Sequence, residues 1–208
     1  MSGYIVCGFY TPDYQGWFDK LRSSLDVYKQ PHDFVVVPKV QGGWEVNTLT
    51  KASHILEAMD RHPDKVIIWL DVDCTVHGDL APLDEHSGDV GLHYFIKRRK
   101  GRALMMRLQS NTKVFKPTKA ARRLVEAWRA HSLQATVGED DEATLTRAIV
   151  ETADIPLSLI DRRWVTSPLR PHPEPVIVQS FASREAPKVR KVMRFIHRHL
   201  GIPAFARV

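Results

Sequence analysis

The chain has 208 residues, of which 43% are hydrophobic and 26% charged, so it is long enough for one sizeable domain and has an ordinary globular composition. It has no apolar run as long as a membrane span, and its two cysteines, Cys7 and Cys74, exclude a disulfide framework. The net charge of +6 favours an anionic partner, and the lack of a signal-peptide pattern at the N-terminus predicts a cytoplasmic protein.

Predicted strands and helices alternate in the first half of the chain. Buried strands are expected at 4–10, 34–38 and 66–70, where apolar residues predominate. Between them, apolar residues recur at helical spacing, at Trp17, Phe18, Leu21 and Leu25 and again at Leu49, Ala52, Ile55, Leu56 and Met59. This alternation predicts a single α/β domain with a mostly parallel central sheet flanked by helices and a Rossmann-like N-terminal half.

The second half of the chain carries shorter predicted elements. Helices are expected to begin near Pro117 and within 138–149, and strands are expected at 89–95, 103–108, 114–115, 155–160 and 176–181. Residues 168–175 are rich in proline and predict an extended connection. We expect one domain over residues 1–185, followed by a basic amphipathic helix and tail over residues 186–208.

Two carboxylates, Asp71 and Asp73, follow the predicted strand 66–70, with Val72 between them. In open α/β sheets, ligands bind at the carboxyl ends of strands. Because alternate residues of a strand point to the same face, both carboxylates are predicted to lie on one side and to converge on one hard cation. A strand that ends in a solvated polar turn would show the same pattern.

Other short motifs occur in order around this acidic pair. Thr11 and Tyr14 follow the first strand, Lys51 lies on the helix before the acidic strand, and the remaining pieces are WLDVDCTV (69–76), Gly78-Asp79-Leu80, SNTKVF (110–115), DEATL (141–145) and residues 159–164. In this order and spacing the chain resembles the GT-A-fold glycosyltransferases, which use nucleotide-diphosphate sugars. The resemblance covers residues 4–184.

The resemblance implies roles on the donor side of an active site. Asp73 would bind a divalent cation, Mn²⁺ or Mg²⁺, and Asp71 would contact the cation or the nucleotide ribose, with Val72 also at the donor. Such a cation would act as a Lewis acid on the leaving diphosphate. Lys51 would reach the ribose or the diphosphate, unless it is simply an exposed helical lysine.

Two further donor-side residues are expected after the first strand. Thr11 and Tyr14 would lie near the base or the ribose. Their alternative roles are a helix cap and a packing tyrosine. In the last quarter of the chain, Gln179 stands where many such enzymes have a histidine metal ligand, and Arg184 would pair with the diphosphate.

On the acceptor side, the resemblance implies that Asp141 is a general base or stabilises an oxocarbenium-like sugar. Because Asp141 lies in the acidic run 139–142, the alternative is a helix-capping acid. Asn111 would contact the sugar or the acceptor. Asp141 and Asn111 are therefore the predicted catalytic residues.

The expected partners are a nucleotide-diphosphate sugar, a UDP-sugar rather than a GDP-sugar, and a saccharide, lipid-linked or protein acceptor. No specific nucleic acid is expected. The basic C-terminal segment also predicts peripheral contact with an anionic membrane.

Two other functions remain open at this point. In a haloacid-dehalogenase-like phosphatase, Asp71 would be the nucleophile and Asp73 the general acid, with Mg²⁺ alongside. That family usually begins at the acidic strand and places a second acid pair at the end of another strand. The other alternative is a non-enzymatic binder of acidic polymers that uses residues 97–102 and the C-terminal helix.

Overall fold

The computed structural model describes residues 3–41, 44–97, 105–136, 138–168, 171–180 and 182. Within these ranges the chain forms one six-stranded sheet with the strand order β2-β1-β3-β6-β5-β7. The strands are β1 (Tyr4–Tyr10), β2 (His32–Val36), β3 (Val66–Leu70), β5 (Val90–Lys97), β6 (Met105–Phe115) and β7 (Leu157–Leu159).

The sheet is mixed but mostly parallel. The pairs β1–β2, β1–β3 and β5–β7 are parallel, whereas β6 runs antiparallel to both of its neighbours, β3 and β5. The predicted α/β class with a mostly parallel sheet is therefore confirmed, and β6 is the strand whose direction the alternation of strands and helices did not reveal.

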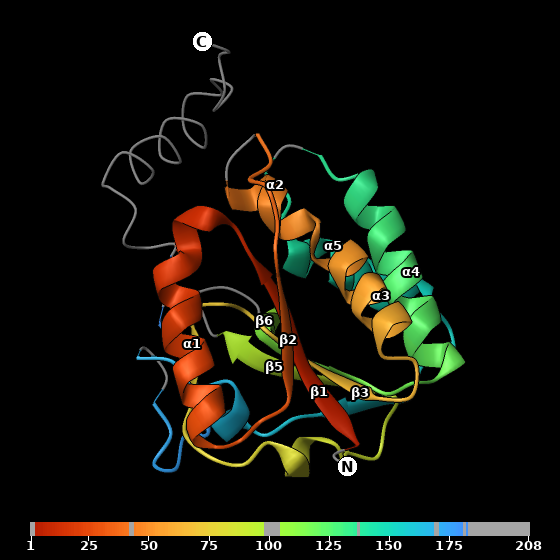
Figure 1. The fold of residues 1–208 in the computed structure, drawn as a ribbon. Helices are drawn as coiled ribbons and strands as arrows, with labels where there is room; N and C mark the ends of the chain where they lie inside the picture. The colour runs from red at the N-terminus through yellow and green to blue at the C-terminus, as the bar shows by residue number, and fades with distance from the viewer. Residues whose placement is uncertain are drawn as a thin grey trace.

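Helices cover both faces of the sheet (Figure 1). One face packs on α1 (Gln15–Val27), which buries its predicted apolar residues Phe18, Leu21 and Leu25. The other face packs on α3 (Lys51–Arg61), α4 (Lys119–Leu133) and α5 (Asp141–Glu151). The short helix α2 (Trp44–Leu49) precedes α3, so the single helix expected around residues 49–59 is divided at Thr50.

Strand β3 lies in the middle of this arrangement, and all five of its residues are buried. Ile68 and Leu70 belong to the core under α1, whereas Ile67 and Trp69 belong to the core under the other helices. A strand that faces two cores has no polar face, which explains its continuous apolar sequence. The chain that leaves β3 therefore emerges from the centre of the sheet.

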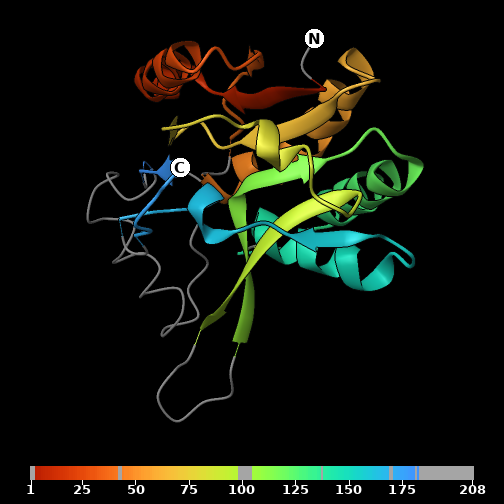
Figure 2. The same cartoon turned by 90° about the horizontal axis from the view of Figure 1, so that it is seen from below.

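Two predicted strands differ from the observed ones. Residues 103–108 and 114–115 were expected as separate strands, but β6 continues through Ser110, Asn111 and Thr112. Its buried Thr112 hydroxyl donates to the Trp164 carbonyl at 2.9 Å, a tertiary hydrogen bond that permits a polar residue in a buried strand. With β5, β6 forms a long hairpin that extends from the body of the molecule (Figure 2).

The predicted strand at 176–181 does not return to the central sheet. Its residues form β8 (Ile177–Gln179), which pairs antiparallel with β4 (Cys74–Val76) in a separate two-stranded sheet. Cys74 lies opposite Gln179 in this pair. The consequence is that the last described strand lies directly beside the acidic turn after β3.

Several predictions concern residues outside the described ranges. They are the basic loop at 97–102 beyond Lys97, Arg184 and the amphipathic helix and tail at 186–208. Among the helices of the described ranges, none is long and apolar enough to cross a membrane.

Replacement of Gly8 by alanine should destabilise the fold, because β1 and β3 approach each other closely there. A Cβ atom on Gly8 would overlap the Phe34 ring of β2 and would lie 2.6 Å from the Leu70 carbonyl oxygen of β3, and backbone in the sheet centre cannot move aside. We expect Gly8→Ala to lower the free energy of unfolding by about 2 kcal/mol, measured by urea denaturation.

The matched control for Gly8 is Gly16 on α1, whose added Cβ would meet nothing within 4 Å. Gly16→Ala should leave stability unchanged or raise it by about 0.5 kcal/mol. Equal effects of the two substitutions would contradict the close approach of β1 and β3 as the cause.

Candidate active site

The acidic pair lies in a turn, not in a strand. Strand β3 ends at Leu70, and the Asp71 N–H donates to the Asn111 carbonyl at 3.0 Å. The Cys74 N–H then donates to the Asp71 carbonyl at 3.0 Å, which closes the turn. The turn thus positions Asp71 and Asp73, and the expectation that strand alternation would place them on one side was based on the wrong local structure.

Asp71 contacts a buried lysine and a second carboxylate. The Lys51 ammonium, at the start of α3, lies 2.8 Å from Asp71 Oδ1 and 2.6 Å from Asp141 Oδ2. The side chains of Lys51 and Asp141 are 5% and 2% exposed, so this ion-paired triad is largely shielded from water. The structure therefore brings three of the predicted site residues together, and it excludes the alternative of an exposed helical lysine.

Electrostatics hold Lys51 in its charged form. Burial by itself lowers the pKa of a lysine, but the carboxylates of Asp141 and Asp71 outweigh burial and hold the pKa of Lys51 above its ordinary value. Since a buried charge is tolerated only when it is paired, each member of the triad depends on the others.

Asp141 can pair with Lys51 because the neighbouring Asp140, and not Asp141, caps helix α5. Asp140 is the N-cap of α5, and its carboxylate accepts a hydrogen bond from the Ala143 N–H at 3.0 Å. The capping role proposed as an alternative for Asp141 thus belongs to Asp140. In the same first turn, the Asp141 side chain points to Lys51, 90 residues earlier in the chain.

Asp73 is held by the segment that follows β8. Its Oδ2 accepts from the Ala182 N–H at 3.0 Å, and its Oδ1 accepts from the Gln179 side-chain amide at 3.3 Å. Burial, reinforced by the charge of Asp71, raises the pKa of Asp73 to about 6, although the two donated hydrogen bonds oppose this. Asp73 is thus a buried carboxylate whose ionised form lacks a full countercharge.

The residues around Asp73 fit a divalent cation by their chemistry. Asp71, Asp73 and Gln179 offer carboxylate and amide oxygens, the ligands that Mg²⁺ and Mn²⁺ accept. The Gln179 amide presents its nitrogen to Asp73, and a half-turn of that amide would present its oxygen instead. A cation beside Asp73 would also offset the repulsion from Asp71.

A different group of metal-ligating side chains lies elsewhere in the fold. Cys7, Asp33 and His62 place their ligand atoms within 4.8 Å of one another. However, the Asp33 carboxylate already accepts hydrogen bonds from Arg61 Nε and His62 Nε2, both at 2.8 Å. These contacts describe a structural ion pair that joins β2 to the end of α3 and the residue after it.

Asn111 lies beside the triad with its side chain unsatisfied. The residue is 1% exposed, and within the described ranges neither its amide nitrogen nor its amide oxygen has a hydrogen-bond partner of ordinary geometry. Burial raises the pKa of the Cys74 thiol, and a contact in which the Asn111 amide donates to the sulfur, a weak acceptor, opposes this rise. A buried amide without a partner of ordinary geometry suits a ligand rich in hydroxyl groups.

Thr11 and Tyr14 lie at the carboxyl end of β1, the strand beside β3. The Thr11 hydroxyl donates to the Asp13 carboxylate at 2.5 Å and does not cap the following helix. Asp13 also pairs with Lys39 at 2.6 Å. Thr11 stands at the N-cap position of the short helix Pro12–Tyr14, and its carbonyl, not its hydroxyl, accepts the Tyr14 N–H. The contact of Thr11 and of Tyr14 with a base or ribose stays a prediction.

The sequence did not single out Lys113, a second fully buried lysine. It lies on β6 opposite Trp69, and its ammonium is 5.3 Å from the centre of the Trp128 ring. Burial, with the charge of Lys51, lowers the pKa of Lys113 to about 7. One feature of the sequence could have revealed this residue: a lysine stands directly before the strand predicted at 114–115, between Thr112 and Val114.

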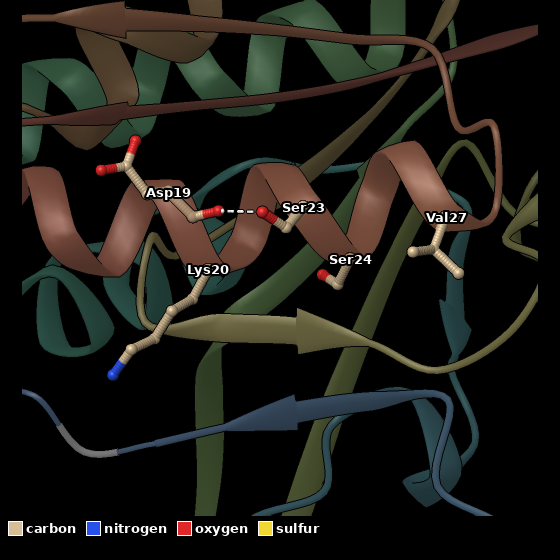
Figure 3. A pocket seen from close by; sticks show the side chains of 5 residues that line it. All are labelled: Asp19, Lys20, Ser23, Ser24 and Val27. Atoms are coloured by element: carbon tan, nitrogen blue, oxygen red, sulfur yellow. Dashed lines mark hydrogen bonds between the residues drawn. The ribbon is translucent and has the colours of Figure 1, made fainter.

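A shallow hollow on the surface of α1 is unrelated to this cluster. It is lined by Asp19, Lys20, Ser23, Ser24 and Val27 (Figure 3). The Ser23 hydroxyl there donates to the Asp19 carbonyl at 2.8 Å, a bond within the helix. Since none of the predicted site residues lines the hollow, it has no part in the candidate site.

Removal of the Lys51 ammonium should be costly, because it leaves two carboxylates without their shared cation. We expect Lys51→Met to lower the free energy of unfolding by about 3–5 kcal/mol, measured by urea denaturation. Adding Asp141→Asn to Lys51→Met should recover part of this loss, since it removes one of the two stranded charges.

A control for the triad is the exposed ion pair between Arg122 and Asp60, whose side chains are 44% and 61% exposed. Arg122→Ala should cost less than about 1 kcal/mol. Strictly additive losses for Lys51→Met and Asp141→Asn would show that the two residues are not coupled.

The raised pKa of Asp73 predicts a dependence of stability on pH. The unfolded chain ionises Asp73 above about pH 4, whereas the folded protein resists ionisation up to about pH 6, so stability from this group falls as pH rises through that window. Asp73→Asn should therefore raise the free energy of unfolding by about 1–3 kcal/mol at about pH 7.5 and have little effect near pH 4.

Asp13 provides a control of opposite sign for Asp73. Hydrogen bonds from Lys39 and Thr11 hold the pKa of Asp13 below its usual value, so Asp13→Asn should destabilise the protein at neutral pH. If Asp73→Asn destabilised the protein at neutral pH as well, the account of Asp73 would be wrong.

Comparison with known proteins gives a fold but no sequence family. The sequence matches no protein-family model and none of the curated proteins. The structure is similar to that of a glycosyltransferase involved in the glycosylation of the major capsid of PBCV-1, with a TM-score of 0.66, 12% identity and coverage of 86% of this chain and 93% of that chain.

Two further solved structures are similar over most of this chain. One is the galactosyltransferase LgtC in complex with donor and acceptor sugar analogs, with a TM-score of 0.53, 8% identity and coverage of 86% of this chain and 87% of that one. The other is the glycosyltransferase GlyE of Streptococcus pneumoniae TIGR4, with a TM-score of 0.54, 12% identity and coverage of 92% of this chain and 59% of that one. At these identities the likeness concerns the path of the chain, and the protein has the GT-A fold.

Proposed function

We propose that the protein is a glycosyltransferase that moves a sugar from a nucleotide-diphosphate donor to an acceptor hydroxyl. The observation that carries the proposal is the buried triad of Lys51, Asp71 and Asp141 beside Asp73, at the carboxyl edge of a GT-A sheet. Ligands of open α/β sheets bind at this edge. The similar solved structures, which are glycosyltransferases by description, support the same class of reaction.

Asp71, Asp73 and Gln179 are the residues that would hold a divalent cation, Mn²⁺ or Mg²⁺. Bound there, the cation would supply Lewis-acid stabilisation of the leaving diphosphate. The protein's own contribution is to bury Asp73, to hold it by the Ala182 N–H, and to keep it next to a second carboxylate, so that the turn attracts a cation.

The geometry favours an electrostatic role for Asp141. Of the two roles considered, general base and stabiliser of a positively charged sugar, the first needs a carboxylate oxygen that can receive the acceptor proton. The Lys51 ammonium, 2.6 Å away, already occupies Asp141 Oδ2, and the side chain is 2% exposed. A fixed, water-excluded charge is suited to stabilising an oxocarbenium-like transition state.

Asn111 completes the proposed donor pocket. Its backbone carbonyl accepts the Asp71 N–H, and its side-chain amide is buried without a partner of ordinary geometry. A sugar hydroxyl that paired with this amide would remove the cost of leaving it unsatisfied. A UDP-sugar is the proposed donor, with Thr11 and Tyr14 on the nucleotide side, and a saccharide, lipid-linked or protein hydroxyl is the proposed acceptor.

The phosphatase alternative is not favoured by the fold. The strand that precedes Asp71, β3, follows two others and pairs antiparallel with β6. The adjacent acids Asp140 and Asp141 open helix α5 and do not end a strand, so they do not match the second acid pair of that family. The acidic-polymer alternative rests on segments that lie largely outside the described residues.

Binding of a nucleotide diphosphate should stabilise the protein in a metal-dependent manner. UDP or GDP at about 100 times its Kd, in the presence of Mn²⁺, should raise the free energy of unfolding by about 2.7 kcal/mol. Thermal-shift measurements would detect this as a higher melting temperature. Asp73→Ala should abolish the effect. The control Asp64→Ala, an exposed acid before β3, should keep it.

The same experiment separates the proposed function from its rival. If neither nucleotide stabilises the protein with Mn²⁺ or Mg²⁺, and if the protein hydrolyses a generic phosphate ester in a way that Asp71→Asn abolishes, the glycosyltransferase proposal is overturned. If UDP stabilises the protein and GDP does not, the proposed donor class is narrowed to UDP-sugars.

A further inference from the structure

We infer that Lys113 is a positioning residue that holds Asp141 and the first turn of α5 in place for sugar transfer. The inference rests on the proposed function, but its structural part can be measured without any substrate. The sequence does not predict a role for Lys113, and the proposed sugar transfer assigns it none.

The location of Lys113 is unusual for a lysine. It is fully buried at the middle of the sheet, on β6 opposite Trp69, which carries its side chain into the core under α3, α4 and α5. Lysines are almost never fully buried unless their charge is used or paired. The charges that act on it come from the triad and its surroundings, namely Lys51, Asp71, Asp141 and Glu142.

A chain of contacts connects Lys113 to the start of α5. Its ammonium lies 5.3 Å from the centre of the Trp128 ring on α4. The Trp128 Nε1–H donates to the Thr144 hydroxyl on α5 at 3.0 Å, and the Thr144 hydroxyl lies 3.2 Å from the Asp141 carbonyl oxygen to which it can donate. Lys113 and Trp128 therefore support the helical turn that carries the Asp141 carboxylate.

The charge of Lys113 also acts on Asp141 directly. The single positive charge of Lys51 faces the two negative charges of Asp71 and Asp141. Lys113, in its protonated form, is attracted to both carboxylates and so offsets part of the remaining negative charge. The energetic cost falls on Lys113, because burial and the charge of Lys51 disfavour its ionised form. A buried lysine whose charge costs stability, and which is connected through Trp128 and Thr144 to the proposed functional carboxylate, is the pattern expected of a site selected for function.

The test is Lys113→Met, which keeps an unbranched side chain that can pack on Trp128, one atom shorter than lysine, but removes the charge. We expect an unfolding midpoint at neutral pH equal to or above that of the wild type, because the cost of a buried charge is gone. We expect backbone amides in the first turn of α5 to exchange hydrogen at least about 10-fold faster, with α1 unchanged. Trp128→Phe, which removes the bond to Thr144 and part of the ring surface that faces Lys113, should loosen the same turn.

Activity is the second readout, with UDP-glucose and UDP-galactose as the probes and Mn²⁺ present. In Lys113→Met, kcat for release of UDP should fall about 10-fold or more while the Kd of UDP stays within about twofold, since the diphosphate side is untouched. The matched control is Lys116→Met, whose ammonium bonds the His86 carbonyl away from the triad; it should change neither exchange in α5 nor kcat.

The outcomes separate this inference from the proposed function. Unchanged exchange in α5, or a fall in unfolding midpoint with parallel losses of nucleotide binding and kcat, would overturn the positioning role and leave Lys113 a structural residue. A wild-type protein that neither binds UDP nor releases it from a UDP-sugar would instead overturn the proposed function, whatever α5 does.

Discussion

A single buried ammonium, that of Lys51, holds the candidate site together. It lies between Asp71 at the end of β3 and Asp141 at the start of α5, and so it ties the centre of the sheet to two helices on one face. Because burial removes the water that would otherwise screen these charges, the pairing is strong only while all three groups are present. The rest of the site is arranged around this constraint.

The strand directions explain why the constraint can exist. Strand β3 emerges from the sheet between β1 and the antiparallel β6, so the Asp71 turn is flanked by the end of β1 on one side and by Asn111 on the other. On the same helix-covered face lie the buried Lys113 and Trp69 of the β3–β6 pair. Charged side chains from β6, α3 and α5 thus lie on the same helix-covered face of the sheet as the apolar core.

The second part of the site depends on the small sheet of β4 and β8. Pairing of Cys74 with Gln179 brings the chain after β8 back across the acidic turn, where the Ala182 N–H and the Gln179 amide hold Asp73. These two hydrogen bonds explain how the Asp73 carboxylate can be buried next to the Asp71 carboxylate. The burial has an energetic cost, which appears as the raised pKa of Asp73, and a bound cation would remove that cost. The two halves of the site therefore have complementary characters: a lysine neutralises Asp71 and Asp141, whereas Asp73 still lacks a full countercharge.

The sequence by itself determined the local features: the buried strand β3 from its apolar run, the acids that follow it, the apolar face of α1 and the helix that begins at Asp141. Only the tertiary structure decided the direction of β6, the pairing of β8 with β4, and the use of Asp140 rather than Asp141 as the cap. It also decided which charges meet, since Lys51 and Asp141 are 90 residues apart and Gln179 and Asp73 are 106 apart. The physical reason is that hydrophobic periodicity reports only which face of an element is buried, whereas contacts between distant side chains depend on how the elements are ordered in the sheet.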